Sequence, residues 1–205
     1  MARKRKPSGR GYRSRRVNIR DPLPRFLIIC EGEKTEPAYF DGFRVPSVTI
    51  ETVGLGKDPL MLVKQTLDRR GQGEYDRVWC VFDRDDVPAD RFNQALLLAQ
   101  QHRIKVAYSN QAFELWYLLH FHYVNTSLSR RDYVDRLSSQ LGRPYQKDDH
   151  TLYRDLLPVQ AEALRNAERL LAQYNPHNAA LDDPSTTVHE LVQELNRFTQ
   201  ERRFS

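Results

Sequence analysis

Two short apolar stretches of the chain end directly in acidic residues, and these acids have the types and spacing of a metal or catalytic site. Residues 26–30 are followed by Glu31, and residues 78–82 are followed by Asp83 and Asp85. Such apolar runs are typical of buried parallel strands. Ligands of open α/β sheets bind beyond the carboxyl ends of these strands. We therefore expect the three carboxylates to meet in one acidic pocket.

Carboxylates at close range repel one another, so this pocket requires a proton or a cation between them. Because the ligands would be oxygen atoms only, Mg²⁺ or Mn²⁺ is favoured over zinc. If the chain stays extended beyond the second strand, Asp83 and Asp85 point to the same side. Two metal ions held in this way can clamp the attacking and leaving oxygens of a phosphodiester. The alternative is an acidic loop whose aspartates only cap a helix.

Three further residues near these strands are candidates for the site. Glu36 lies at an expected helix start, where it is either a further ligand or a partner of the positive helix end. Glu114 is flanked by apolar residues, so its burial requires a metal or a hydrogen-bond partner. Lys34 is either a group that neutralises a phosphate oxygen or an ordinary exposed lysine. Glu36 and Glu114 are thus second-rank ligands or general bases.

The elements that must position these residues alternate between strand and helix. The order β-α-β-α-β-α-β favours a mainly parallel four-stranded sheet with flanking helices, hence the α/β class. No glycine-rich Walker loop is present, so we expect no nucleotide hydrolysis by this chain. The expected strands are 25–30, 48–53, 78–82 and 104–109, and the expected helices begin near 35 and cover 58–70 and 88–102.

The chain divides into three regions by composition. Residues 1–24 form a basic arm, residues 25–125 the α/β domain, and residues 126–205 a helical carboxyl-terminal region. The last region carries amphipathic patterns near 129–141, 160–173 and 187–201. Its helices cover the sheet, form a separate lobe or offer a partner surface, and periodicity alone does not choose.

Composition favours a cytoplasmic protein. The chain has 205 residues, of which 40% are hydrophobic, and no apolar run approaches the ~18 residues that a membrane span needs. Its first residues lack the apolar stretch of a secretion signal. Cys30 and Cys80 both fall inside expected strands, so we expect buried free thiols. A disulfide between adjacent strands is the alternative.

The net charge of +5 is concentrated at the amino terminus, because residues 1–20 hold nine Arg or Lys and no acid. Basic tails of this kind often contact polyanions. The alternative is a solvated extension that aids solubility. Sequence-independent attraction to phosphates that weakens with salt would come from Arg3, Lys4, Arg5, Lys6, Arg10, Arg13, Arg15 and Arg16.

Four blocks of the sequence resemble the RloB family, which is described as carrying a TOPRIM-type domain. They are C-E-G-E-K-T-E-P from Cys30, F-D-R-D from Phe82, the stretch 109–121 and P-S-T-T-V from Pro184. The basic amino-terminal arm further supports the resemblance. The resemblance covers most of residues 13–198, with the blocks in the expected order. In TOPRIM domains the matching acids bind Mg²⁺, which implies metal-binding roles for Glu31, Asp83 and Asp85. The family pattern has a proline where this chain has Gln111, a change that would loosen the turn aiming Glu114.

The resemblance implies a Mg²⁺-dependent endonuclease of bacterial anti-phage or abortive-infection defence. Its substrate would be DNA or RNA, tRNA included, and its partner an AAA-type ATPase encoded nearby. Two alternatives stay open. One is a non-catalytic module that binds nucleic acid or ribosomes. The other is a different TOPRIM-type phosphotransfer enzyme.

Overall fold

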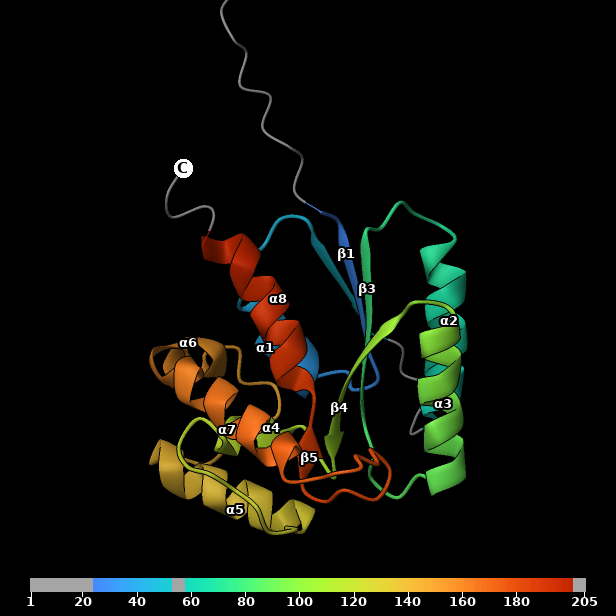
Figure 1. Cartoon of the computed structure of the whole chain (residues 1–205). Coiled ribbons are helices and arrows are strands. Elements are labelled where there is room, and N and C mark those ends of the chain that lie inside the picture. Colours follow the sequence, from blue (N-terminus) through green and yellow to red (C-terminus); the bar gives the residue numbers. More distant parts are fainter. Residues whose placement is uncertain (1–23, 53–57, 201–205) are drawn as a thin grey trace, which may run out of the picture.

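The computed structural model describes residues 24–52 and 58–200 and contains a five-stranded sheet of order β2-β1-β3-β4-β5 (Figure 1). The four predicted strands are confirmed, and they run parallel to one another. A fifth strand was not predicted, and it pairs antiparallel with the end of β4. The strands are β1 (Phe26–Cys30), β2 (Val48–Thr52), β3 (Arg77–Asp83), β4 (Lys105–Asn110) and β5 (Ser185–Thr186).

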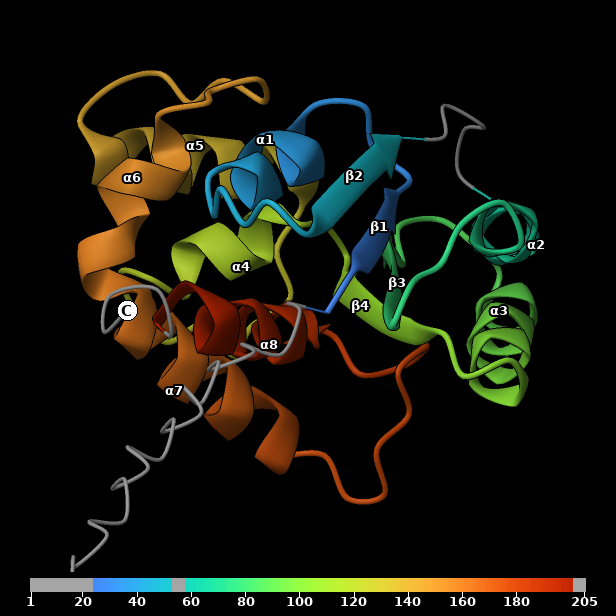
Figure 2. The same ribbon diagram turned by 90° about the horizontal axis from the view of Figure 1, so that it is seen from above.

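Helices cover both faces of this sheet, as the α/β class requires. Helices α2 and α3 lie together on one face, and the remaining helices lie on the other (Figures 1 and 2). The bounds are α1 (Thr35–Asp41), α2 (Pro59–Arg70), α3 (Ala89–Gln101), α4 (Glu114–Leu118), α5 (Arg130–Leu141), α6 (Leu152–Leu156), α7 (Gln160–Ala172) and α8 (Val188–Gln200), with a 3₁₀ turn at Leu157–Val159.

Strand β1 shows why its sequence is apolar without alternation. All five of its residues are buried, because side chains leave a strand to opposite faces in turn and both faces are covered. Leu27 and Ile29 join the core beneath α2 and α3. Phe26, Ile28 and Cys30 join the larger core on the other face.

The carboxyl-terminal helices share that larger core and therefore cover the sheet. Val188, Leu191 and Leu195 of α8 are fully buried in it together with Trp79 of β3 and Trp116 of α4. One continuous apolar core thus joins residues 25–125 to residues 126–200. Of the three arrangements open at the sequence level, the cover on the sheet is the one observed.

The connections diverge between β1 and β3, and this divergence creates a crevice. From β1 the chain passes through α1 to β2 on one side of the sheet. From β3 it passes through α3 to β4 on the other side. At such a switch point the carboxyl ends of the two strands open onto space that ligands can fill.

The predictions about the cysteines, a membrane span and the basic arm are compared with the structure one by one. Cys30 and Cys80 are free, buried thiols as predicted. Within the described residues, none of the helices combines the length and the apolarity needed to traverse a lipid bilayer. The basic arm falls outside the described residues except for Pro24, so its predicted role in phosphate attraction stays a prediction.

Candidate active site

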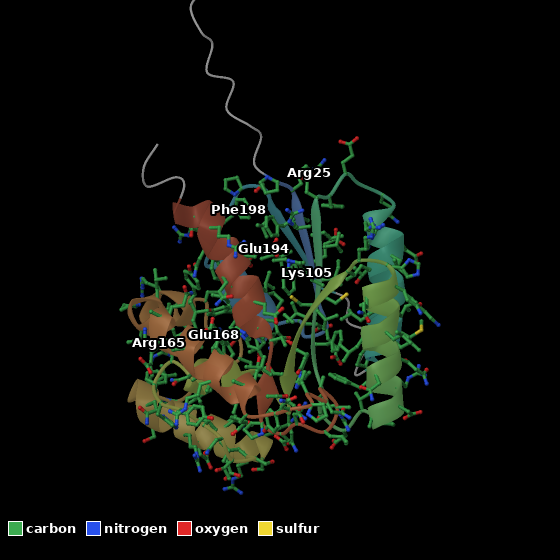
Figure 3. The ribbon with its side chains drawn as sticks, in the orientation of Figure 1. Arg25, Lys105, Arg165, Glu168, Glu194 and Phe198 are labelled. Atoms are coloured by element: carbon green, nitrogen blue, oxygen red, sulfur yellow. The ribbon has the colours of Figure 1, made fainter. Side chains whose placement is uncertain are left out.

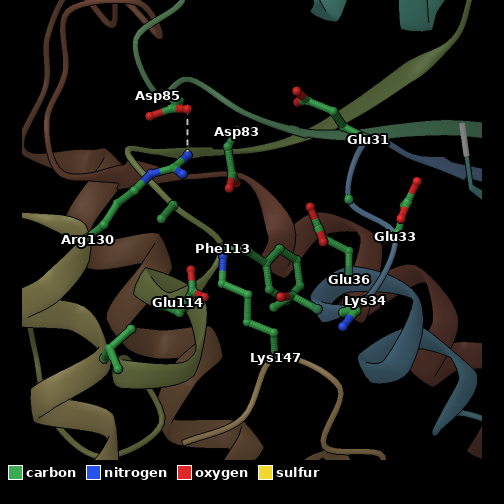
Figure 4. A pocket seen from close by; sticks show the side chains of 14 residues that line it. Glu31, Glu33, Lys34, Glu36, Asp83, Asp85, Phe113, Glu114, Arg130 and Lys147 are labelled. Atoms are coloured by element: carbon green, nitrogen blue, oxygen red, sulfur yellow. Dashed lines mark ion pairs between the residues drawn. The ribbon is translucent and has the colours of Figure 1, made fainter. Parts of the chain in front are cut away.

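A pocket of about 360 Å³ opens at the carboxyl ends of β1 and β3 (Figure 4). Its walls come from the loop after β1, the turn after β3, the start of α4, and two parts of the carboxyl-terminal region. All five predicted acids and Lys34 line this pocket. The charged residues around it are Glu31, Glu33, Lys34, Glu36, Asp83, Asp85, Glu114, Arg130 and Lys147.

Asp83 forms the floor of the pocket as the last residue of β3. Its Oδ1 atom is buried and has no hydrogen-bond partner among the described residues. Burial raises the pKa of Asp83 well above its usual range, and repulsion from Glu36, Glu114 and Glu31 raises it further. A carboxylate oxygen in this condition is costly to keep ionised unless a cation or a proton compensates it.

Glu36 lies beside this floor because the loop after β1 folds the start of α1 back over Gly32. A Cβ atom at position 32 would overlap the Glu36 carboxylate, so a larger residue there would displace the Glu36 side chain from its present position. Burial raises the pKa of Glu36 to about 7, and repulsion from Glu114 and Glu31 adds to the rise. The positive charge of Lys147 lowers the pKa of Glu36 in part.

Glu114 lines the pocket and also has the hydrogen-bond partner that its burial requires, while its role as a ligand or general base stays a prediction. It is buried at the first turn of α4 and lines the pocket. The Tyr145 hydroxyl donates a hydrogen bond of 3.1 Å to Glu114 Oε1. The carboxylate is thus aimed at the pocket by a partner from the carboxyl-terminal region, and the turn before α4 is fastened by Asn110 Nδ2, which donates to the carbonyl oxygen of Asp182 (2.9 Å).

Asp85 departs from the extended geometry that we predicted after β3. The strand ends at Asp83, and Asp85 has a φ of +37°, a value uncommon for a residue other than glycine. The chain turns because the Asp85 amide donates to the carbonyl of Gln111 and the amide before it donates to Ser109. Asp85 still lines the pocket, where its Oδ2 lies 2.6 Å from Nη2 of Arg130 (Figure 4).

Glu31, Asp83 and Asp85 line one pocket, as predicted. Their side chains do not lie close enough together to share a metal ion as the structure stands. Among the described residues, no three Asp, Glu, His or Cys side chains lie close enough to hold a metal ion together. One cause is visible, because Arg130 holds Asp85 in an ion pair. The carboxylates that act most strongly on Asp83 are Glu36 and Glu114, which the sequence ranked second.

The donor set nevertheless fits a hard divalent cation. The candidate ligands are all carboxylate oxygens, which suit Mg²⁺ or Mn²⁺. The buried Oδ1 of Asp83 lacks a partner in the described part of the chain, and a cation would satisfy it. Binding requires the surrounding carboxylates to approach one another, which the cation itself would favour by cancelling their repulsion.

Sequence reasoning missed three residues of this site, all from the carboxyl-terminal region. Arg130 is the first residue of α5, Tyr145 reaches Glu114, and Lys147 lines the pocket mouth. The amphipathic pattern near 129–141 predicted the helix that carries Arg130, although not the direction in which it faces. No signal in the polar stretch after α5 pointed to Lys147.

A family model described as RloB-like protein matches residues 26–195 of this chain. The chain belongs to the RloB-like family. The matched span holds all five strands and every residue that lines the pocket, so membership applies to the whole site of this RloB-like protein. No significant match was found among curated proteins or among solved structures.

Proposed function

We propose that this RloB-like protein is a Mg²⁺- or Mn²⁺-dependent nuclease that hydrolyses phosphodiester bonds of DNA or RNA. The observation that carries the proposal is the buried Oδ1 of Asp83, which lacks a hydrogen-bond partner among the described residues and lies at the floor of an acidic pocket. The pocket lies at the switch point of a mainly parallel sheet, where α/β proteins bind their ligands.

The metal ligands in this proposal come from three segments. Asp83 is the last residue of β3, Glu31 follows the adjacent strand β1, and Glu114 lies at the start of α4. Asp85 joins them once Arg130 releases it. When bound, a divalent ion supplies charge stabilisation for a phosphoryl oxygen and lowers the pKa of water.

Among the acids that line the pocket, Glu36 is the best placed general base. With its pKa near 7, a large fraction of Glu36 is ionised at neutral pH, and a base with a pKa near the working pH is effective. In the proposed reaction a water oxygen attacks phosphorus and Glu36 takes the water proton. The bond from phosphorus to the leaving oxygen breaks, and the leaving oxygen takes a proton from solvent.

The proposal places this reaction in bacterial anti-phage defence, together with a separate AAA-type ATPase. Family membership supports this placement, since the resemblance of the sequence implied both. The basic arm would bring polyanionic substrate toward the pocket by sequence-independent attraction. Because the partner would gate the activity, the isolated chain can be silent in a simple assay.

The test compares the wild type with Asp83→Asn on DNA, total RNA and tRNA, with Mg²⁺, with Mn²⁺ and without metal. Each arm is repeated with the product of any adjacent ATPase gene. Asp90→Asn is the matched control, because Asp90 is exposed on α3 and far from the pocket lining. We expect metal-dependent cleavage by the wild type and the control only. No cleavage under any condition, or equal cleavage by Asp83→Asn, refutes the nuclease.

One observation favours a second candidate function, a non-catalytic module that binds nucleic acid or ribosomes. The described carboxylates do not form a closed ligand set as they stand. In this case Asp83→Asn would leave nucleic-acid or ribosome binding and cellular toxicity unchanged. A gel-shift titration and a ribosome co-sedimentation with both proteins separate this module from the nuclease.

A further inference from the structure

Lys147 is, with Arg130, one of two cations that the carboxyl-terminal region brings to the pocket. It lies in the segment between α5 and α6, and Figure 4 shows its side chain extending from that segment into the pocket. Its charge acts on Glu36, so the ammonium group lies within electrostatic reach of the acidic floor. The residue is solvent-exposed, which leaves its four-carbon stem free to follow a ligand.

The segment that carries Lys147 is fastened on both sides of it. Tyr145, which is buried, donates to Glu114. Asp149 forms an ion pair of 2.5 Å with Arg143 across the base of the segment and accepts from the Thr151 amide at 2.9 Å. The position of residue 147 relative to the pocket is therefore fixed by contacts of its neighbours.

The three cations of the pocket differ in their partners. Arg130 pairs with Asp85 at 2.6 Å, and Lys34 pairs with Asp148 at 3.8 Å. Within residues 24–52 and 58–200, Lys147 has no carboxylate within 4.0 Å of its ammonium, although six acids line the same pocket. The ammonium charge of Lys147 is therefore not neutralised by an ion pair with a described residue and can bind an anion in the pocket.

We propose that Lys147 binds a non-bridging oxygen of the substrate phosphate in this pocket and is a catalytic residue of the phosphodiester hydrolysis. This inference rests on the proposed function and names the group that accepts the anionic substrate. A phosphodiester carries a negative charge toward a wall of carboxylates, which repels it. Lys147 offsets this repulsion on the solvent side, and the charge that develops on the phosphoryl oxygens during attack strengthens its contact.

The chemistry of the side chain suits this role. A lysine ammonium is a compact point charge with three rotatable donors and serves widely as a phosphate ligand. A pocket of about 360 Å³ lies in the usual size range of small-molecule sites. It therefore accommodates one nucleotide unit, with the phosphate between Lys147 and the acidic floor.

The test uses a probe of a single nucleotide unit, which matches the size of the pocket. Binding of thymidine 3′,5′-bisphosphate is measured by calorimetry in the presence of Ca²⁺, for the wild type, Lys147→Ala, Lys147→Arg and Lys64→Ala. Lys64 is an exposed lysine on α2 outside the pocket, so its variant loses the same charge elsewhere. We expect Lys147→Ala to weaken binding about 10-fold, as for one charge-assisted hydrogen bond. Lys147→Arg and Lys64→Ala should bind nearly as the wild type does.

Each outcome bears on one proposal or the other. Equal affinity of Lys147→Ala and Lys64→Ala, or no binding by the wild type at millimolar probe, overturns the role of Lys147. If the wild type binds the probe through Lys147 but cleaves no nucleic acid, phosphate binding by Lys147 is supported and the nuclease is refuted. Where nucleic acid is cleaved, an unchanged kcat in Lys147→Ala refutes the catalytic part alone. Thermal melting of all four proteins checks that each variant is folded.

Discussion

A buried carboxylate lies near each end of strand β3, and the two carboxylates differ in their hydrogen-bond partners. At the amino end, Glu194 of α8 accepts from Arg77 Nε (3.0 Å), Trp79 Nε1 (3.0 Å) and Lys105 Nζ (2.9 Å). Figure 3 shows Glu194 and Lys105 near one another in this part of the molecule. At the carboxyl end, Asp83 keeps one buried oxygen without a partner in the described residues.

Under the proposed function, the difference separates an acid that supports the fold, Glu194, from an acid that binds the metal ion, Asp83. A buried polar group left unsatisfied costs about 1–3 kcal/mol of stability, and more when it is charged. Glu194 avoids this cost with two cations and an indole N–H, and it ties α8 to the sheet. Asp83 bears the cost in the free protein, and such a cost is typical of sites that a ligand completes.

Asp83→Asn should give the largest effect, a loss of metal-dependent cleavage of more than about 100-fold, since even the loss of a residue that supports a metal ligand costs 10–100-fold. In the metal-free protein the same change removes a charge that burial and Glu36 oppose. Its melting temperature should therefore equal or exceed that of the wild type. A cleavage assay and a melting curve measure the two effects. A strongly destabilised variant would show that Asp83 supports the fold as Glu194 does.

The metal-free protein should lose stability as the pH rises from about 4.5 to about 7. Glu36 has a raised pKa of about 7 in the folded state and 4.5 as its ordinary value. The folded state therefore binds more protons in this interval, which makes the slope of stability against pH negative. The loss is up to about 3 kcal/mol. Urea unfolding at several pH values measures it.

Glu36→Gln should flatten this pH dependence, and saturating Mg²⁺ should reduce it, because a cation compensates the ionised carboxylates. Glu31, Asp83, Glu114 and Lys147 face the same pocket, and Asp83, whose pKa is also raised by burial, contributes to the remaining slope. If the slope of stability against pH is identical in Glu36→Gln and in the wild type, the raised pKa of Glu36 in the folded state is contradicted.

Glu194→Gln should lower stability by about 2 kcal/mol, because charge-assisted hydrogen bonds contribute roughly 1.5–3 kcal/mol. For a chain of this size the melting temperature should fall by about 4–8 °C. The amide keeps the shape of the carboxylate but presents a donor to Arg77 or Lys105. Metal-dependent cleavage per folded molecule should not change. An altered kcat would show that the two ends of β3 are coupled.

Arg130→Gln should give the smallest effect, a gain of a few-fold in affinity for Mn²⁺. The ion pair with Asp85 is partly exposed, with 46% of the Arg130 side chain accessible, and such pairs contribute about 1 kcal/mol or less. The change releases Asp85 toward the metal. Electron paramagnetic resonance of Mn²⁺ titrated into both proteins measures the affinity. Weaker binding in the variant would show that Arg130 supports the site rather than competing with the metal.

The sequence predicted the parts of the fold that local patterns encode. Continuous apolar runs such as Phe26–Cys30 indicated buried parallel strands, and the acids behind them indicated the pocket. Strand β5 was missed because its two residues, Ser185 and Thr186, are too few to show the alternating pattern of a strand. Its pairing with Asn110 and Ser109 is long-range and leaves no local signal.

The site was predicted less completely than the fold for a related reason. The residues that follow strands were found, since strand ends converge by topology. Asp85 was placed in an extended continuation, whereas hydrogen bonds to a distant turn reverse the chain there. Lys147 and Tyr145 reach the pocket from a polar segment far along the chain, and only tertiary packing decides which way such residues face.

The central place of β3 in the sheet divides the pocket into a rigid part and an adaptable part. Asp83 ends a strand that is hydrogen-bonded on both sides, by β1 and by β4, so its backbone amides should be among the last to exchange with deuterated solvent. Lys147 and Arg130 belong to an exposed segment and a helix start at the rim. Substitutions at the rim should therefore disturb the base of the pocket less than substitutions within β3.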